Sequence, residues 1–393
     1  MSREQQNPRE QMVKWRVALL MASLSAGLAT LGVTPPNAGE RGLVVHEWGT
    51  FTSIAGEDGT AVDWRPLAGE SDLPSFVYNI ADLQNGAGVR VRWHGKQDIT
   101  ARVRMETPVV YFYSDREMTV SVKVGFPKGR ITEWYPRADS VRDGIDWGRV
   151  KILRDVPMSF PMEKEPSRYY AARETDASPI RVCSEAGNEM EKFLFYRGVG
   201  FFDPPLAVTL EGDKVRVKNL GTNRVAELIL FERHNGRIAY RIQRSDTGDT
   251  VMVRMTESGS LESLFAQVEK ILVDHGLYKK EAKAMLKTWR DSWFEEGLRV
   301  FYVLPRNTTD AVLPITIDPQ PTQLVRVLVG RIEIITPEME SAIRAEIQRL
   351  NDPSPDVRAA ARTALRKQGR FAEPVVKRLK GGNDDGLVKE IFE

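Results

Sequence analysis

Apolar and polar side chains alternate with a period of two residues along most of the chain between Leu43 and Ile335. The clearest case is residues 118–126, MTVSVKVGF, in which every second side chain is apolar. This period is typical of a strand with one buried face and one solvated face. Because antiparallel sheets tolerate one wet face, the pattern predicts antiparallel pairing.

Two hairpins are legible in the same region. Gly212-Asp213 separates the apolar alternation of residues 206–210 from that of 215–217, and Asn235-Gly236 separates residues 228–231 from 238–242. Such dipeptides favour the tight turns of β-hairpins. Further strands are predicted at residues 89–94, 103–113, 299–304 and 324–335. Pro108 interrupts one of them, which restricts that strand to a sheet edge or a bulge.

Strands do not alternate with helices, and there is no glycine-rich phosphate loop. A parallel nucleotide-binding sheet is therefore disfavoured. The sequence predicts a mainly β protein, with an antiparallel β-sandwich-like region over residues 39–336. Within it, apolar side chains at helical spacing predict a helical hairpin over residues 260–297. Its two tryptophans, Trp289 and Trp293, are interpreted as core packing rather than as a binding groove.

Residues 337–393 form a third region. Helices are predicted at 338–350, 356–368 and 371–379, with a Pro-containing break between the first two. The stretches DPSPDVRAAARTALRKQG and FAEPVVKRL resemble HEAT-type helical repeats over about 50 residues. Solenoids usually need about three repeats, so this resemblance implies a HEAT-like cap, a docking arm or a fragment packed on the sandwich.

The N-terminus predicts export. Residues 1–16 carry four basic and two acidic side chains, and Val17–Val33 carries no charge. This pattern is typical of a signal peptide over residues 1–38, cleaved after Ala29 or Ala38. An uncleaved anchor is the alternative, although 17 residues are short for a span of about 20. We expect a protein of the periplasm, the cell envelope or the extracellular space, with peripheral membrane contact left open.

Composition narrows the classes of partner and cofactor. The whole chain has 56 Lys plus Arg and 54 Asp plus Glu, and without residues 1–38 the two counts are equal, so the remaining chain has no net charge. Because proteins bind nucleic acid through an excess of positive charge, we expect no nucleic-acid partner. The single cysteine, Cys183, excludes an intrachain disulfide and any CxxC zinc motif. We predict no cofactor and no metal. The oligomeric state is not predicted.

Few residues could carry catalysis. In VVHEWGTFTS, a strand would place His46 and Glu47 on opposite faces, and the sequence lacks the HExxH spacing of zinc proteases. A site that joins His46, His94 and Glu106 is one hypothesis. The alternative is two partly buried histidines and a glutamate paired with neighbouring arginines. No GxSxG nucleophile motif is present.

Two sets of side chains could bind a ligand. Trp48, Trp93, Trp134 and Tyr135 offer aromatic faces that suit a sugar or a peptide, or they fill the core. Arg358, Arg362 and Arg366 recur every four residues, which favours either an anionic partner or a solvated helix face.

The runs HEWGTFTS, METPVVYFYS, FPKGRITEWYP and WRDSWFEEGLRVFYVLPR resemble a group of uncharacterised bacterial exported proteins. The resemblance covers most of residues 43–335 and implies that this region is one unit. Two hypotheses on function remain. One is an exported cell-envelope protein that binds a glycan, a peptide or a protein partner without catalysis, and the other is a hydrolase acting on an envelope polysaccharide or peptide.

Overall fold

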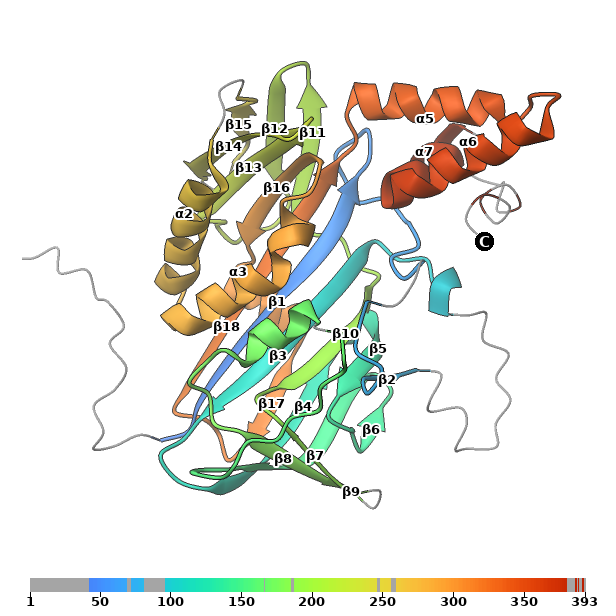
Figure 1. The fold of residues 1–393 in the computed structure, drawn as a ribbon. Helices are drawn as coiled ribbons and strands as arrows, with labels where there is room; N and C mark the ends of the chain where they lie inside the picture. Colours follow the sequence, from blue (N-terminus) through green and yellow to red (C-terminus); the bar gives the residue numbers. More distant parts are fainter. Residues whose placement is uncertain are drawn as a thin grey trace, which may run out of the picture. The chain divides into compact units, whose positions relative to one another are not determined.

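The computed structural model describes residues 42–68, 72–80, 96–165, 167–184, 187–245, 248–255, 259–379, 386, 388 and 391. The predicted signal segment, residues 1–38, and the predicted strand at 89–94 lie outside these residues. Within them, no helix combines the length and the apolar character that crossing a membrane requires. The fold is strand-rich, with three sheets, an inserted helical hairpin and C-terminal helices (Figure 1).

The largest sheet, called the central sheet here, has nine described strands in the order β14-β13-β16-β18-β1-β3-β10-β5-β2. Their bounds are β1 (Val44–Ala55), β2 (Tyr78–Asn79), β3 (Val103–Tyr113), β5 (Gly129–Tyr135), β10 (Leu194–Gly200), β13 (Glu227–His234), β14 (Arg237–Arg244), β16 (Gly297–Val303) and β18 (Gln323–Ile334).

Most pairs in the central sheet are antiparallel, as predicted, but β1 pairs with β18 in parallel along its whole length. The alternation in each strand could not show this, because a strand's period is the same in both kinds of pairing. The strand through Pro108 is central rather than at an edge, and it bulges at Thr107, where φ is 45°. A Cβ on Gly49 would lie 2.9 Å from the Pro108 Cα, so this close approach requires glycine.

Two smaller sheets face one side of the central sheet. One has the order β17-β4-β7-β8-β9, and the other has the order β11-β12-β15. Their bounds are β4 (Met118–Gly125), β6 (Ser140–Val141), which pairs with β7, β7 (Gly144–Ile152), β8 (Ile180–Ser184), β9 (Gly187–Glu191), β11 (Leu206–Glu211), β12 (Lys214–Asn219), β15 (Thr250–Val253) and β17 (Ile315–Asp318). Both predicted hairpins are confirmed, as β11-β12 and β13-β14. Asn235 and Gly236 both have positive φ, as a type I′ turn requires.

A continuous apolar core joins the three sheets and gives the sandwich-like part of the fold. A second core lies on the opposite side of the central sheet, here called its helix-facing side. There α2 (Leu261–Asp274) and α3 (Lys279–Trp293) cover β13, β16 and β18. Figure 1 shows this hairpin beside the central sheet, with the short helix η2 (Arg168–Arg173) near the end of α3.

The first helix of the hairpin begins and ends where the sequence predicted, whereas the second ends at Trp293, before the predicted limit at residue 297. The Ser260 hydroxyl accepts from the Ser263 amide at the start of α2, and Gly276 takes a positive φ after its end. Trp289 and Trp293 are buried and stacked on each other with ring centroids 6.4 Å apart. Their interpretation as core residues is confirmed.

The C-terminal helices are α5 (Pro337–Arg349), α6 (Pro355–Gln368) and α7 (Ala372–Leu379), and they enclose a small apolar core of their own. They belong to the same compact unit as the sheets. Arg370, in the short helix η3 (Gly369–Phe371), donates to Glu333 of β18 at 2.9 Å. The remaining short helices are η1 (Lys96–Asp98) and α4 (Arg306–Val312).

Candidate functional site

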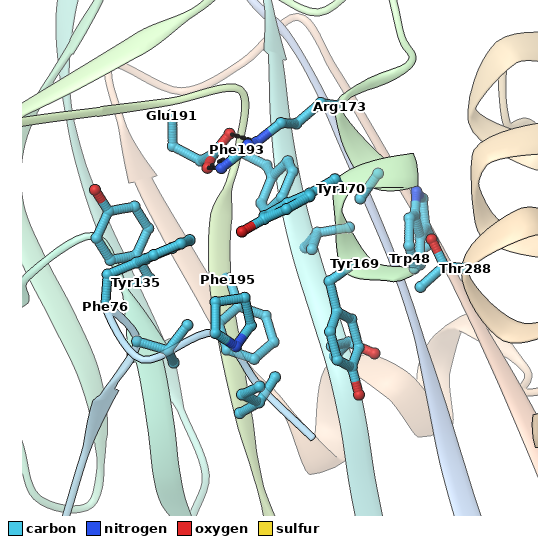
Figure 2. A pocket seen from close by; sticks show the side chains of 16 residues that line it. Trp48, Phe76, Tyr135, Tyr169, Tyr170, Arg173, Glu191, Phe193, Phe195 and Thr288 are labelled. Atoms are coloured by element: carbon cyan, nitrogen blue, oxygen red, sulfur yellow. Dashed lines mark hydrogen bonds and ion pairs between the residues drawn. The ribbon is translucent and has the colours of Figure 1, made fainter. Parts of the chain in front are cut away.

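The helix-facing side of the central sheet continues beyond the hairpin onto β1, β3, β10 and β5, where a small cavity lies. Its volume is about 40 Å³, and it is apolar. Aromatic side chains surround it, as Figure 2 shows: Trp48, Phe76, Tyr135, Tyr169, Phe193 and Phe195. We call this the aromatic cavity.

Strand periodicity places these rings together. Trp48 lies on β1, Phe195 on β10 and Tyr135 at the end of β5, each directed to the same side of the sheet. Phe76 meets Tyr135 edge to face with ring centroids 5.0 Å apart. This spacing is within the favourable range for aromatic pairs.

Two polar atoms in the cavity lining lack partners. In the described structure, neither the Trp48 Nε1–H nor the Thr107 hydroxyl has a hydrogen-bond partner, although both are buried. Thr107 also has the positive φ of the β3 bulge. A buried unsatisfied polar group costs about 1–3 kcal/mol, so a ligand that supplies a partner gains that much.

An ion pair borders the cavity. Arg173 donates to both carboxylate oxygens of Glu191, at 3.0 and 2.6 Å, and to the Pro161 carbonyl at 2.9 Å. Burial raises the pKa of Glu191 above its ordinary value, while the Arg173 guanidinium acts in the opposite direction. The Arg173 guanidinium also lies 4.5 Å from the centre of the Tyr170 ring.

Irregular chain and η2 cover the cavity, and Thr288 of α3 completes its lining. The irregular piece is residues 72–77, here called the cover segment, which contributes Leu73, Pro74, Phe76 and Val77 to the lining. The Ser75 amide ties this segment to the stretch before η2 by donating to the Glu163 carboxylate at 2.6 Å. The Glu163 amide in turn donates to the Tyr170 hydroxyl at 3.0 Å.

Asp72 anchors the start of the cover segment. Arg197 donates to its carboxylate at 2.9 Å, and the Tyr169 hydroxyl donates at 2.5 Å. Burial opposes ionisation of Asp72, yet the Arg197 guanidinium and these hydrogen bonds hold its pKa well below its ordinary value. Arg168 also pairs with this carboxylate.

The structure brings together two of the four predicted aromatic ligand residues. Trp48 and Tyr135 both line the aromatic cavity. Trp134 points to the opposite side of the sheet, into the core between the sheets, where it stacks on Tyr78. Trp93 lies outside the described residues.

The structure does not bring His46 and Glu106 together. His46 lies opposite Tyr111 on the neighbouring strand and Glu106 lies opposite Thr50, a separation of four residues, or about 13 Å, along β1. His94 lies outside the described residues. As predicted, His46 and Glu47 point to opposite sides of the sheet, the first to Glu281 and the second to Arg326.

Each of these candidates already has buried partners. His46 Nδ1 lies 2.7 Å from the Glu281 carboxylate, with both side chains completely buried. Glu106 accepts from the Thr52 hydroxyl at 3.0 Å and lies 3.1 Å from Arg104 Nε. Within the described residues, no three His, Cys, Asp or Glu side chains are grouped to hold a metal ion.

Two of the predicted arginines of α6 are engaged within the C-terminal region, residues 337–393. Arg358 donates to the carbonyls of Asp352 and Pro353, and Arg366 donates to the Ile391 carbonyl. Arg362 also has an interaction partner. Arg358 and Arg366 therefore serve the structure of the C-terminal region in addition to any charge they present to solvent.

Sequence reasoning missed several residues at the cavity. Phe193 and Phe195 belong to the run KFLFYRG, whose alternate aromatics could have been read as one face of a strand. Arg197 is a charged residue inside that apolar run, which signals a buried ion pair. Asp72, Arg173 and Glu191 follow from no local motif, because they meet only in the folded chain.

No family model matches this sequence, and no curated protein matches it either. Two solved structures of the yeast delta-COP-I mu-homology domain are distantly similar. The first, in complex with a Dsl1 WxWxV peptide, has a TM-score of 0.26 and 8% identity, and the match covers 77% of this chain and 98% of that chain. The second has a TM-score of 0.27 and 10% identity, and covers 77% and 99%. These scores are too low to inform on fold or function.

Proposed function

We propose that this protein is an exported, non-enzymatic binding protein of the cell envelope, and that it holds an apolar side chain of a peptide or protein partner in the aromatic cavity. Export is supported by the basic residues 1–16 followed by the uncharged stretch Val17–Val33. The observation that carries the binding proposal is an aromatic cavity on the central sheet, covered largely by irregular chain and the short helix η2.

The lining favours an apolar group over a sugar. A glycan presents many hydroxyl groups, and its site needs a matching number of polar side chains around the aromatic faces. Here the charged groups, Arg173 and Glu191, already satisfy each other. The free polar atoms in the lining are few, chiefly the Trp48 Nε1–H and the Thr107 hydroxyl. A peptide supplies both an apolar side chain and carbonyl acceptors for such donors.

The acid and base candidates support the non-enzymatic reading. His46 and Glu106 are almost completely buried, and each already has a polar partner, whereas His94 lies outside the described residues. General acid–base catalysis requires a group within reach of the substrate's proton. The binding hypothesis needs no such access.

Calorimetry tests the proposal. The ligands are N-acetylphenylalanine amide, N-acetyltryptophan amide and an oligosaccharide of N-acetylglucosamine. Val109→Ile adds one methylene to the aromatic cavity, and Val268→Ile adds one to a cavity of about 20 Å³ under α2 as the matched control. We expect the amides to bind with micromolar to millimolar Kd, with at least threefold weaker binding by Val109→Ile and unchanged binding by Val268→Ile. Binding of the sugar alone, or equal effects of both variants, would overturn the proposal.

A further inference from the structure

The cover segment contacts the aromatic cavity through its side chains, as a bound peptide would. Within residues 72–77 the described backbone hydrogen bonds are the Val77 amide to the Pro74 carbonyl and the Ser75 amide to Glu163. Neither of them joins the segment to the central sheet. Pairing with the sheet begins only at Tyr78 and Asn79, opposite Trp134 and Glu133. The segment before Tyr78 is therefore held to the sheet by side chains.

Its first anchor is a carboxylate in a preformed cationic receptor. The Arg197 side chain is 3% exposed, and its two terminal nitrogens donate to Asp72 and to the Tyr169 hydroxyl. Arg168 completes the set of donors. All three receptor residues belong to β10 or η2, so the receptor does not depend on the cover segment for its position. Any carboxylate of suitable reach matches this set of donors.

Its second anchor is apolar. Leu73, Phe76 and Val77 are half-buried and pack against the aromatic floor of the cavity. The fit is incomplete, because a cavity of about 40 Å³ remains beneath them and the Trp48 Nε1–H stays unpartnered. A ligand with the same two anchors that fills the floor better would bind more tightly than the segment does.

We propose that the cover segment is an intramolecular stand-in for the ligand, and that the true partner is a peptide segment with an acidic residue followed by apolar side chains, as in Asp-Leu-Pro-x-Phe-Val. The inference rests on the proposed function and narrows its partner to this class of peptide. The partner displaces residues 72–77, places its carboxylate on Arg197, Arg168 and Tyr169, and places its apolar side chains on the floor of the cavity. Only molecules in which the cover segment has left the cavity can bind the peptide. The apparent affinity for the peptide is therefore the intrinsic affinity multiplied by the fraction of molecules in this open state.

A peptide with the sequence of residues 72–78, acetylated and amidated so that its aspartate is its only charge, tests this inference. It is titrated into the wild-type protein and into the double variant Asp72→Asn/Phe76→Ala, which removes the charge of the first anchor and the ring of the second. We expect at least tenfold tighter binding to the double variant. A peptide with Asn in place of its Asp should bind the double variant at least tenfold more weakly than the original peptide.

Two further variants keep the test decisive if the double variant is poorly folded. Glu163→Gln weakens the tie to Ser75 without touching either anchor, and it should give an intermediate gain in affinity. Asp203→Asn breaks an exposed pair with Arg102 elsewhere and should leave affinity at the wild-type value. If the peptide binds the wild type, Glu163→Gln and the double variant with equal affinity, the cover segment does not occupy the peptide's site and the inference is wrong.

The outcome also separates this inference from the proposed function. If N-acetylphenylalanine amide binds the wild type and Val109→Ile weakens it, but the peptide binds none of the variants, only the inference fails. If neither the amide nor the peptide binds any variant, both fail.

Discussion

The two halves of the helix-facing side share one sheet and one apolar cluster, yet they are covered in different ways. Over β13, β16 and β18 the cover is α2 and α3, whose backbone groups are satisfied within the helices. Over β1, β3, β10 and β5 it is chiefly η2 and irregular chain tied down by Asp72, Glu163 and Arg173, although α3 reaches this half through Glu281 and Thr288. The first arrangement is typical of a permanent core, and the second is typical of a surface that can open.

Unsatisfied indole groups do not by themselves distinguish the halves. The Nε1–H groups of Trp289 and Trp293 lack partners under the hairpin, as that of Trp48 does in the aromatic cavity. The difference lies in the cost of exposing the floor. Moving the hairpin would expose two stacked tryptophans together with the apolar side of two helices. Moving the cover segment would expose the buried Pro74 and three half-buried side chains, and it would break a few side-chain contacts.

The largest expected effect is in the hairpin half. Trp293→Ala removes a completely buried ring that contacts Trp289, Phe294 and Phe301. Because a large cavity would remain, we expect the free energy of unfolding to fall by about 3–5 kcal/mol. Urea denaturation followed by far-UV circular dichroism measures this change. A loss below about 1 kcal/mol would mean that the hairpin is as weakly attached as the cover segment.

The same kind of truncation should cost less in the other half. Phe76→Ala removes a half-buried ring from the cover segment, and we expect a loss of about 1–2 kcal/mol or less. Proteolytic cleavage within residues 72–78 should become faster, while cleavage of α2 and α3 stays unchanged. If global stability falls as far as in Trp293→Ala, the segment is part of the permanent core and the contrast between the halves is lost.

The sequence predicted the elements of the hairpin half better than those of the cavity half. Helical periodicity in residues 261–293 and strand periodicity in β16 and β18 follow from local spacing, and both are confirmed. The aromatic cavity joins Trp48, Phe76, Tyr135 and Tyr169 from four separate segments. No spacing rule links such positions, since long-range pairing decides which of them meet.

The same limit explains the catalytic candidates. Local spacing placed His46 and Glu47 on opposite sides of β1, and this is confirmed. It could not show that His46 meets Glu281, 235 residues later in the chain. Nor could it show that β1 is flanked by β18 in parallel, since no local pattern marks which strand becomes a neighbour. Side-chain type and period predict the face of a strand, and topology decides what lies opposite it.

The smallest expected effect is the acid sensitivity of the cover segment alone. The pKa values of Asp72 and Glu163 lie below their ordinary values, Asp72 because Arg197 outweighs the opposing effect of burial, and Glu163 because of its hydrogen bonds with Ser75. A carboxyl with a depressed pKa stabilises the folded contact above its unfolded pKa, about 4, and this contribution is lost as pH falls through the folded pKa. We therefore expect the Ser75 and Val77 amides to lose protection as pH falls below about 4, while the amides of α3 keep theirs. Hydrogen exchange between pH 6 and pH 3, corrected for intrinsic exchange rates, measures this loss of protection.

The double variant Asp72→Asn/Glu163→Gln is the matched control. Protection of its Ser75 and Val77 amides should not change with pH and should equal the low protection that the wild type reaches at low pH. Parallel loss of protection in α3 would mean that acid acts on the whole fold, and the cover segment would then have no separate opening.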